Sequence, residues 1–377
     1  MAMGSAGDPT SLAEQGRRSE RRRHAERFRD PRDPSRRLIA RFASIDWNAP
    51  QEYSTFKSNN ILLIDAAKKG KAVSREVHNG YRTFTRNGRV IGGFYQLTTS
   101  LTSDLAKTVV RSRPLVKDCL ESAGVPTSIG RGFAVGDLQG ACDYMHDLGG
   151  SVTVKPEAGR RGDGISTGVA SDQELTHAWN FAQPQEKTPL WRAKNILVEQ
   201  FVPGVDIRVY IVGEAVVGAL ARLPLFIVGD GRSNVATLTR AAVAARSRNA
   251  FLAETPPDIS ADALYDLDLD PLETLPVGEL RDVSGTSNPK AGGVTLDVTE
   301  NLSDPLRRLA VDALWAIPGL PAGGVDLRVS DLSQTATAVV TDVTDSADMS
   351  LHRYPAFGTW RSPAPSVVAQ MLAESAA

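Results

Sequence analysis

A single lysine at the end of an apolar segment, followed by a glycine-rich loop, is the clearest chemical feature of this sequence. The apolar run ends at Lys155, and Gly159, Gly162 and Gly164 lie in the loop that follows. Glycines let backbone N–H groups approach phosphate oxygens closely, and lysine supplies a point charge. The lysine precedes the glycines, so this is not a Walker loop. The pattern predicts a polyphosphate site, and a plain β-hairpin is the alternative.

Acidic and basic residues recur at short spacing in the strands predicted farther along the chain. Glu199 lies near the end of one apolar run, and Asp206 and Arg208 lie in the next. Arg222 lies in a third run. Each residue alone fits an ordinary strand-end acid or an outward-facing strand residue. Their order after Lys155 favours a common site.

In these segments the sequence resembles the ATP-grasp superfamily, and more narrowly the ligase domains of cyanophycin synthetase and the bifunctional glutathione-forming enzymes. The similarity extends over residues 105–358. The segments that carry it are 155–156, 159–164, 199–208, 222–224, 228–232, 287–288, 292–293, 297–299, 324–326 and 352–358. The resemblance implies an α/β (α+β) ATP-grasp fold, with the nucleotide between two subdomains and a small α/β domain before them.

The resemblance also implies an activity. Such a protein joins a carboxylate to an amine through an acylphosphate and releases ADP and phosphate. ATP and Mg²⁺ would be its cofactors, amino acids or small peptides its substrates, and small-peptide or specialised-metabolite biosynthesis its setting. A homodimer is expected. Two alternatives stay open: a nucleotide-binding module with a regulatory or scaffold role, and a ligase whose basic N-terminal segment binds a partner.

By the same resemblance, twelve residues are implied in nucleotide binding. They are Arg113, Lys155, Gly159, Arg160, Arg161, Gly162, Gly164, Glu199, Gln200, Phe201, Val202 and Asp206. Lys155 is expected at the α- and β-phosphates, with the glycine loop closing over them. Backbone groups of residues 200–202 are expected at the adenine edge, and Asp206 at the ribose hydroxyls. Arg113 stands where the family has a lysine, and a surface arginine on an amphipathic helix is its alternative.

Four residues are implied in catalysis by the resemblance. Arg208 and Arg222 match arginines near the γ-phosphate and the acyl phosphate. His352 and Arg353 lie in a segment similar to the loop that borders the acceptor site. They are expected to hold a substrate carboxylate or guide an amine, and an exposed structural loop is the alternative.

The expected metal ligands depart from the family pattern. Asp326 fits the first carboxylate, but Asp342 stands in place of a glutamate and Thr344 in place of an asparagine. Aspartate is one methylene shorter, and a hydroxyl is a weaker ligand than an amide carbonyl. These changes put two-metal binding in doubt and favour the nucleotide-binding alternative.

The composition is that of an ordinary globular protein. The chain has 377 residues, is 41% hydrophobic and 23% charged, and has a net charge of −1. Nucleic-acid binding is therefore not expected. The two cysteines favour free thiols in a reducing compartment. With no membrane-spanning run and no signal peptide in the sequence, we expect a cytoplasmic protein and no membrane partner.

Four segments are predicted. Residues 1–37 hold ten arginines and predict a solvated helix or a disordered arm. Residues 38–104 predict the N-terminal domain, with a helix over 60–70 and a hairpin turning at Asn87-Gly88. Residues 105–205 and 206–377 predict the central and C-terminal ATP-grasp subdomains. Single helices are expected over 105–123 and 241–253.

Overall fold

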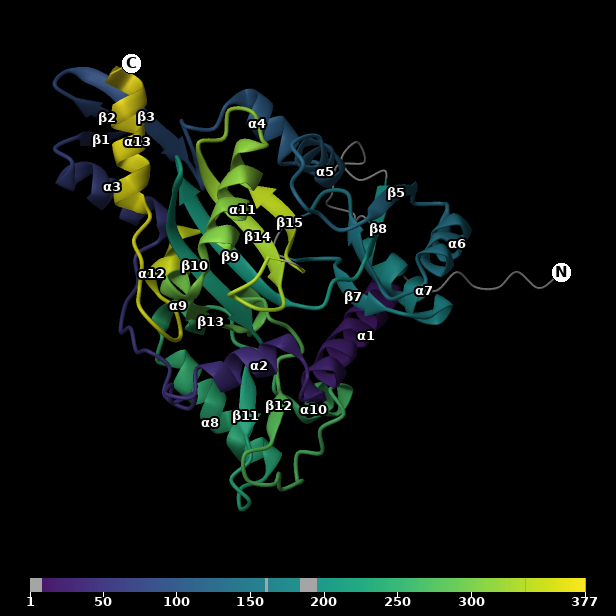
Figure 1. The fold of residues 1–377 in the computed structure, drawn as a ribbon. Coiled ribbons are helices and arrows are strands. Elements are labelled where there is room, and N and C mark those ends of the chain that lie inside the picture. Colours follow the sequence, from purple (N-terminus) through teal and green to yellow (C-terminus); the bar gives the residue numbers. More distant parts are fainter. Residues whose placement is uncertain (1–8, 160–161, 184–194, 336, 377) are drawn as a thin grey trace.

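The strands of this protein form three larger sheets and a two-stranded ribbon. The computed structural model describes residues 9–159, 162–183, 195–335 and 337–376. A five-stranded sheet lies between two four-stranded sheets, one N-terminal and one central (Figure 1). The strand pairings within these sheets are antiparallel.

The N-terminal sheet packs against two helices that are far apart in the sequence. Its strands are β1 (Val73–His78), β2 (Tyr81–Arg86), β3 (Arg89–Tyr95) and β4 (Thr98–Thr99), and the helices are α3 (Asn59–Lys69) and α13 (Ala364–Ala376). As predicted, α3 stops at Gly70, and Asn87-Gly88 turns the chain between β2 and β3 with φ of 50° and 76°. The N-terminal unit also includes a segment from beyond residue 104, because Val367 and Met371 of α13 pack in the same core.

The single helix predicted over 105–123 is wrong. The chain forms α4 (Asp104–Val109) and α5 (Arg113–Ser122) instead. Pro114 lies in the first turn of α5, where its missing N–H costs nothing, and the Ser112 hydroxyl accepts a hydrogen bond from the backbone N–H of Leu115. Leu115 is exposed, while Val116 and Leu120 are buried.

The central unit is a four-stranded sheet covered by two helices. Its strands are, in spatial order, β5 (Gly130–Ala134), β8 (Asn195–Gln200), β6 (Val152–Pro156) and β7 (Ser166–Val169), and its helices are α6 (Leu138–Leu148) and α7 (Asp172–Ala182). Trp179 lies in the core of this unit and its Nε1 donates to the carbonyl of Val135 (3.0 Å). The buried tryptophan thereby fixes α7 on the sheet.

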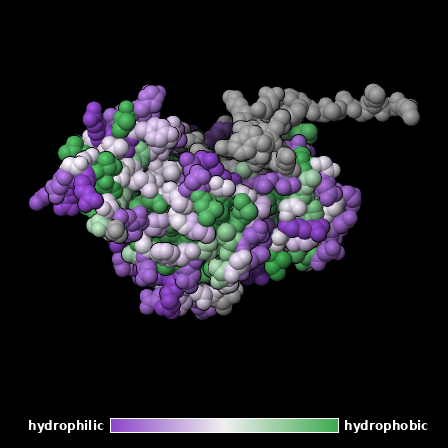
Figure 2. All heavy atoms as spheres, turned by 90° about the horizontal axis from the view of Figure 1, so that it is seen from above, coloured by the Kyte–Doolittle hydropathy of each residue, from purple (hydrophilic) through white to green (hydrophobic). Residues whose placement is uncertain are grey.

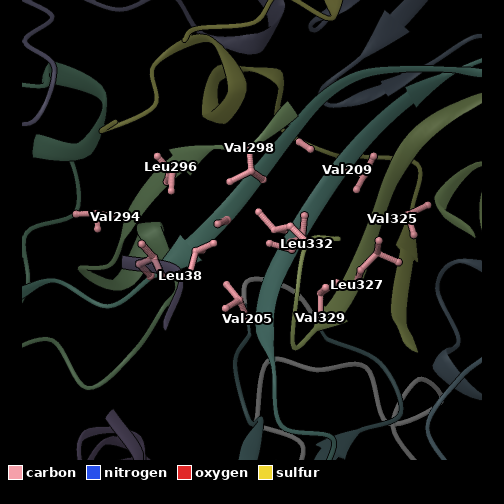
Figure 3. Close-up of a cluster of buried hydrophobic side chains, with 14 of the residues drawn as sticks. Leu38, Val205, Val209, Val294, Leu296, Val298, Val325, Leu327, Val329 and Leu332 are labelled. Carbon is pink, nitrogen blue, oxygen red and sulfur yellow. The ribbon is translucent and has the colours of Figure 1, made fainter. Parts of the chain in front are cut away.

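The five-stranded sheet has one apolar face and one polar face. Its strands are, in spatial order, β13 (Val294–Asp297), β10 (Ala215–Leu223), β9 (Val205–Val212), β14 (Ala322–Val329) and β15 (Val339–Thr344). On β9 and β14, alternate residues such as Val205, Val209, Val325 and Leu327 are buried in the core shown in Figure 3. Because side chains alternate along a strand, the residues between them point to the opposite face.

Smaller elements surround this sheet. They are α8 (Val235–Ser247), α9 (Ala250–Ala253), α10 (Ala261–Asp266), α11 (Asp304–Trp315), α12 (Met349–Arg353), the 3₁₀ turns Pro289–Ala291 and Thr299–Asn301, and the ribbon strands β11 (Phe226–Val228) and β12 (Leu280–Asp282). The helix predicted over 241–253 is therefore two helices. The Asn249 side chain caps the second, accepting from the N–H groups of Phe251 and Leu252.

From residue 9 on, the basic N-terminal segment is helical, which is one of the two predicted alternatives, but the helix packs against the protein instead of lying free in solvent. It forms α1 (Pro9–Arg29), followed by α2 (Pro34–Arg41). α1 contacts α7 and β7 of the central unit and α10 and β12 near the five-stranded sheet, as Figure 1 shows. Ala25 and Phe28 are buried, and so is the side chain of Arg23. Arginines occupy the exposed side of α1 and part of its buried side.

The surface and the thiols are those of an ordinary globular chain. On the face shown in Figure 2, hydrophilic and hydrophobic residues are interspersed. Within the described ranges, we find no helix with the length and apolarity that a bilayer crossing requires. Cys119 and Cys142 are both free, as expected.

Candidate active site

The polar face of the five-stranded sheet and the central sheet enclose a cavity of about 890 Å³. Asp206 and Arg208 of β9, Arg222 of β10 and Asp326 of β14 all line it. Lys155 and Glu199 line it from the central sheet. The alternation of side chains on each strand thus delivers the predicted charged residues to one space.

Two arginines share one carboxylate at the base of this cavity. Arg208 and Asp326 are directly paired across β9 and β14, and the guanidinium binds both carboxylate oxygens, with Nη2 to Oδ2 at 2.6 Å. Nη2 of Arg222 lies 2.5 Å from Oδ1 of the same aspartate. Nε of Arg222 is buried and has no hydrogen-bond partner in the described part of the chain. This buried donor is therefore left unsatisfied among the residues that the structure describes.

The electrostatics of this cluster follow from burial and pairing. Burial alone would raise the pKa of Asp326, but the charges of Arg208 and Arg222 outweigh it and hold that pKa well below its usual range. Burial disfavours the charged form of Arg208, and the carboxylate of Asp326 overcomes this and raises the pKa of the arginine. Asp326 and Arg208 are therefore both charged at neutral pH.

Lys155 reaches the same cavity from the end of β6. Its Nζ lies 2.7 Å from Oε2 of Glu199 on the neighbouring strand β8, and both side chains are buried. Nζ also donates to the backbone carbonyl of Thr341 on β15 (3.4 Å). The lysine therefore connects the central sheet with the five-stranded sheet.

Asp342 enters the cavity on the same face as Asp326, next to an irregularity in β15. Asp342 pairs with Asp326 and Val340 with Leu327, so Thr341 is an extra, bulged residue. Burial raises the pKa of Asp342; the nearby charge of Arg113 opposes this, and that of Asp326 reinforces it. Among the described residues, its carboxylate accepts a hydrogen bond from the backbone N–H of Val343 (2.9 Å).

Asp326, Asp342 and Thr344 are the oxygen donors that would hold a magnesium ion in this cavity. Mg²⁺ is commonly held by one or two carboxylates together with substrate phosphates. Asp342 and Asp326 are paired neighbours that line the cavity, and the Thr344 hydroxyl lines it two residues further along β15. In the described ranges, no group of three or more His, Cys, Asp and Glu side chains is arranged to hold a metal.

Asp206 lies at the far end of the cavity beside an arginine that the sequence did not single out. Nη2 of Arg328 is 3.2 Å from Oδ1 of Asp206, and the Ser287 hydroxyl donates to Oδ2 (3.2 Å). The Phe201 ring adjoins them, 6.0 Å from the Arg328 guanidinium. Gln200, Phe201 and Val202 also line the cavity, so the expected adenine and ribose residues lie together.

The comparisons with known proteins agree with this arrangement. No family model matches the chain. A cyanophycin synthetase of Synechocystis sp. is 26% identical over 265 residues, which cover 67% of this chain and 29% of that protein. A bifunctional glutathione biosynthesis protein of Streptococcus thermophilus is 24% identical over 358 residues, covering 87% and 45%. A bifunctional glutathione synthetase structure from Pasteurella multocida aligns with a TM-score of 0.59 and 21% identity over 84% of this chain and 44% of that one.

The chain has the ATP-grasp fold. The predicted fold class and the predicted similarity to cyanophycin synthetase and the glutathione-forming enzymes are confirmed. The chain spans less than half the length of each of these three relatives.

The other residues that the sequence predicts for nucleotide binding follow Lys155 or lie beside its strand. Nη1 of Arg113 donates to the backbone carbonyl of Pro156 (2.5 Å), so Arg113 lies beside the lysine strand rather than on an outer helix face. Gly159 and Gly162 line the cavity. Gly164 instead packs against the end of α7. A Cβ added at this position would lie 3.2 Å from the carbonyl oxygen of Phe181. Arg160 and Arg161 lie outside the described residues.

His352 and Arg353 do not line the cavity, contrary to the expectation of an acceptor-site pair. The His352 side chain is buried behind the site against the Tyr210 ring, because α12 packs on the sheet. Both of its ring nitrogens lack a hydrogen-bond partner among the described residues. The Arg353 guanidinium stacks over the ring of Trp360, 4.2 Å from its centroid. Both positions indicate packing roles.

Sequence reasoning missed two contributions to the cavity. Arg328 lies two residues after Asp326 in β14, so the period of a strand could have placed it on the same face. The other contribution comes from α1, whose residues 17–28 supply part of the lining. Its arginine-rich composition hid the apolar contacts made by Ala13, Ala25 and Phe28.

Proposed function

We propose that this protein is an ATP-dependent ligase that forms an amide bond between a carboxylate and an amine. One observation carries the proposal: Lys155, Arg208 and Arg222 converge with two aspartates in a single cavity between two sheets. Amide formation through an acylphosphate needs cations around the transferred phosphoryl group and a site sheltered from water. The confirmed fold and the similarity to ligases support the same activity.

In the first step, the γ-phosphoryl group of ATP moves to an oxygen of the substrate carboxylate, and ADP leaves. Lys155 neutralises charge on the phosphates as its bond to Glu199 is exchanged for one to the nucleotide. Arg208 and Arg222, which both line the cavity, stabilise the transferring group. Their guanidiniums are held in position by Asp326, so little reorganisation is needed.

In the second step, the amine nitrogen attacks the acyl carbon, the bond from that carbon to the phosphate oxygen breaks, and the amine releases a proton to solvent. The released phosphate carries negative charge, which Arg208 and Arg222 again stabilise. Mg²⁺, when bound by Asp326 and Asp342, would neutralise charge on the nucleotide phosphates.

Amino acids or small peptides are the substrates that this proposal includes. The names of the relatives refer to cyanophycin and glutathione, and we extend only the general class of substrate to this chain. A cytoplasmic location, a biosynthetic role in small-peptide or specialised metabolism and a homodimer belong to the same proposal.

The test has two parts. Calorimetry with a non-hydrolysable ATP analogue and magnesium should show binding that Lys155→Ala weakens by about 1–3 kcal/mol, the scale of a charged hydrogen bond. Lys68→Ala, at an exposed position of α3, is the control and should bind as the wild type does. A screen of amino-acid pairs for ADP release, with mass detection of the product, then identifies the substrates.

Two outcomes would contradict the proposal. Equal binding by wild type and Lys155→Ala removes the lysine from the nucleotide site. Nucleotide binding without ADP release from any amino-acid or dipeptide pair would replace the ligase with a nucleotide-binding regulatory or scaffold module.

A further inference from the structure

The N-terminal helix α1 supplies one side of the cavity. Six of its residues line the space, and they are Arg17, Glu20, Arg21, His24, Arg27 and Phe28. Their spacing of three and four residues places them on one continuous side of the helix. α1 therefore presents a single surface to the nucleotide site over much of its length.

Contacts with the central unit hold α1 beside β7. The Arg27 guanidinium donates from Nη1 to the backbone carbonyl of Thr167 (2.8 Å) and from Nη2 to its hydroxyl (2.7 Å). The backbone N–H of Thr167 donates in turn to the carboxylate of Glu20 (2.8 Å). A Cβ on Gly16 would lie 2.5 Å from the carbonyl of His177, so α1 and α7 are in backbone contact here.

Contacts with the other side of the cavity hold the same helix near the two-stranded ribbon. Nδ1 of His24 lies 2.8 Å from Oδ2 of the buried Asp282 on β12. The Phe28 and Phe226 rings pack with centroids 5.8 Å apart. Arg29 pairs with Asp268 (2.6 Å). α1 thus spans both units and is fixed at each.

Arg27 lies where the base and ribose of a nucleotide are expected. Its guanidinium is 5.2 Å from the centroid of the Phe201 ring. The same ring is contacted by Arg328, which pairs with Asp206. Arg27 therefore adjoins the expected adenine segment directly, and the expected ribose ligand lies next to the same ring through Arg328.

We propose that α1 completes the nucleotide site and that Arg27 binds the nucleoside end of the nucleotide. This rests on the proposed function, because it assumes that the cavity takes ATP. A guanidinium can stack on a purine and donate to ribose oxygens at once, which suits this place between an aromatic ring and an aspartate.

The experiment separates the nucleoside end from the phosphates. Calorimetry measures the affinities of the full chain for a non-hydrolysable ATP analogue and for inorganic tripolyphosphate, which lacks base and ribose. Arg27→Ala should lower the affinity for the ATP analogue about 10-fold, which is the scale of a hydrogen bond from a charged group. The affinity of the Arg27→Ala variant for tripolyphosphate should change by less than about twofold. Lys155→Ala should instead lower the affinity for both ligands.

Arg23→Ala is the matched control. Arg23 is a buried arginine of the same helix and also donates to the carbonyl of Thr167 (3.4 Å), but it does not line the cavity. It should keep the wild-type ratio of the two affinities even where it lowers the melting temperature. Should Arg27→Ala fail to fold, Arg27→Lys retains the charge without the planar guanidinium and should shift the ratio in the same direction.

Three results would overturn the inference. In the first, both Arg27 variants keep the wild-type ratio of the two affinities. In the second, the affinities for the analogue and for tripolyphosphate fall equally. In the third, the affinity for the analogue rises, which would mean that α1 obstructs the site. Failure of the proposed function looks different, because the wild type would then not bind the analogue or Lys155→Ala would have no effect.

Discussion

Asp326 is the acceptor on which the two guanidinium groups of the cavity converge. Removing both arginines from water is costly, and their shared carboxylate offsets that cost within the folded protein. A phosphoryl group is also an anion with several acceptor oxygens. The carboxylate therefore holds the guanidinium groups of Arg208 and Arg222 together at one place in the cavity.

Arg222→Ala should lower turnover by about 10²-fold or more and change ATP affinity only modestly. The reason is that charge develops on the phosphoryl group during transfer, so a fixed guanidinium acts mainly in the transition state. Steady-state kinetics on an identified substrate pair measure both constants. Arg240→Ala, at an exposed position of α8, provides the comparison. A changed Michaelis constant with unchanged turnover would contradict this role.

His352 makes the stability of the fold depend on pH. Burial lowers the pKa of His352 to about 3, and the charge of Arg208 acts in the same direction. The folded protein keeps the ring neutral, whereas the unfolded chain takes up a proton below its ordinary pKa of about 6.5. The free energy of unfolding should therefore fall, by up to about 1.4 kcal/mol per pH unit from this residue, as the pH drops from about 6.5 toward 3.

Urea unfolding of wild type and His352→Leu across this pH range checks the prediction. Leucine loses no hydrogen bond, because both ring nitrogens are unpartnered among the described residues. The variant should show a flatter decline than the wild type. Parallel curves would mean that His352 takes up a proton in the folded state as readily as in the unfolded one.

At the scale of elements, the packing of α1 on α7 depends on a missing side chain. Gly16→Ala should lower the free energy of unfolding by about 1–3 kcal/mol, because the added Cβ would meet the carbonyl of His177 and the Cβ of Phe181, each at 2.5 Å. Gly136→Ala is the control, since no atom lies within 4 Å of its added Cβ. Urea denaturation of both variants measures the difference, and equal stabilities would show that α1 shifts without cost.

Elements with strong local signals could be predicted from the sequence, and elements that depend on distant partners could not. Gly70 and the Asn87-Gly88 pair marked a helix end and a hairpin, because their backbone conformations need those residue types. Pro114 carried the signal that divides α4 from α5, and the helical period of the apolar residues obscured it. α1 could not be foreseen as a packed helix, because its partners are acids and carbonyl groups of other units.

At the scale of the whole molecule, part of the site could likewise be predicted from the sequence, and part depended on how distant elements pack. The order of the motifs, together with the resemblance to ATP-grasp ligases, predicted that Lys155, Asp206, Arg208, Arg222 and Asp326 share a site, and all five line one cavity. The burial of His352 follows from how α12 packs on the sheet, and no periodicity in its own segment reports that. Nor does any local pattern indicate that α13 completes the core of the N-terminal sheet.

The connection of α1 to β12 has a consequence for synthesis on the ribosome. His24 and Asp282 are 258 residues apart, so the first helix is translated long before the strand that it needs. The core of the N-terminal sheet likewise stays incomplete until α13 has been translated. Domains commonly fold from the N-terminus as they emerge, but here the earliest segments must remain without their final partners until late in translation. Phe28 and the apolar side of β3 therefore lack their final partners during that interval, when exposed apolar surface is prone to non-native association.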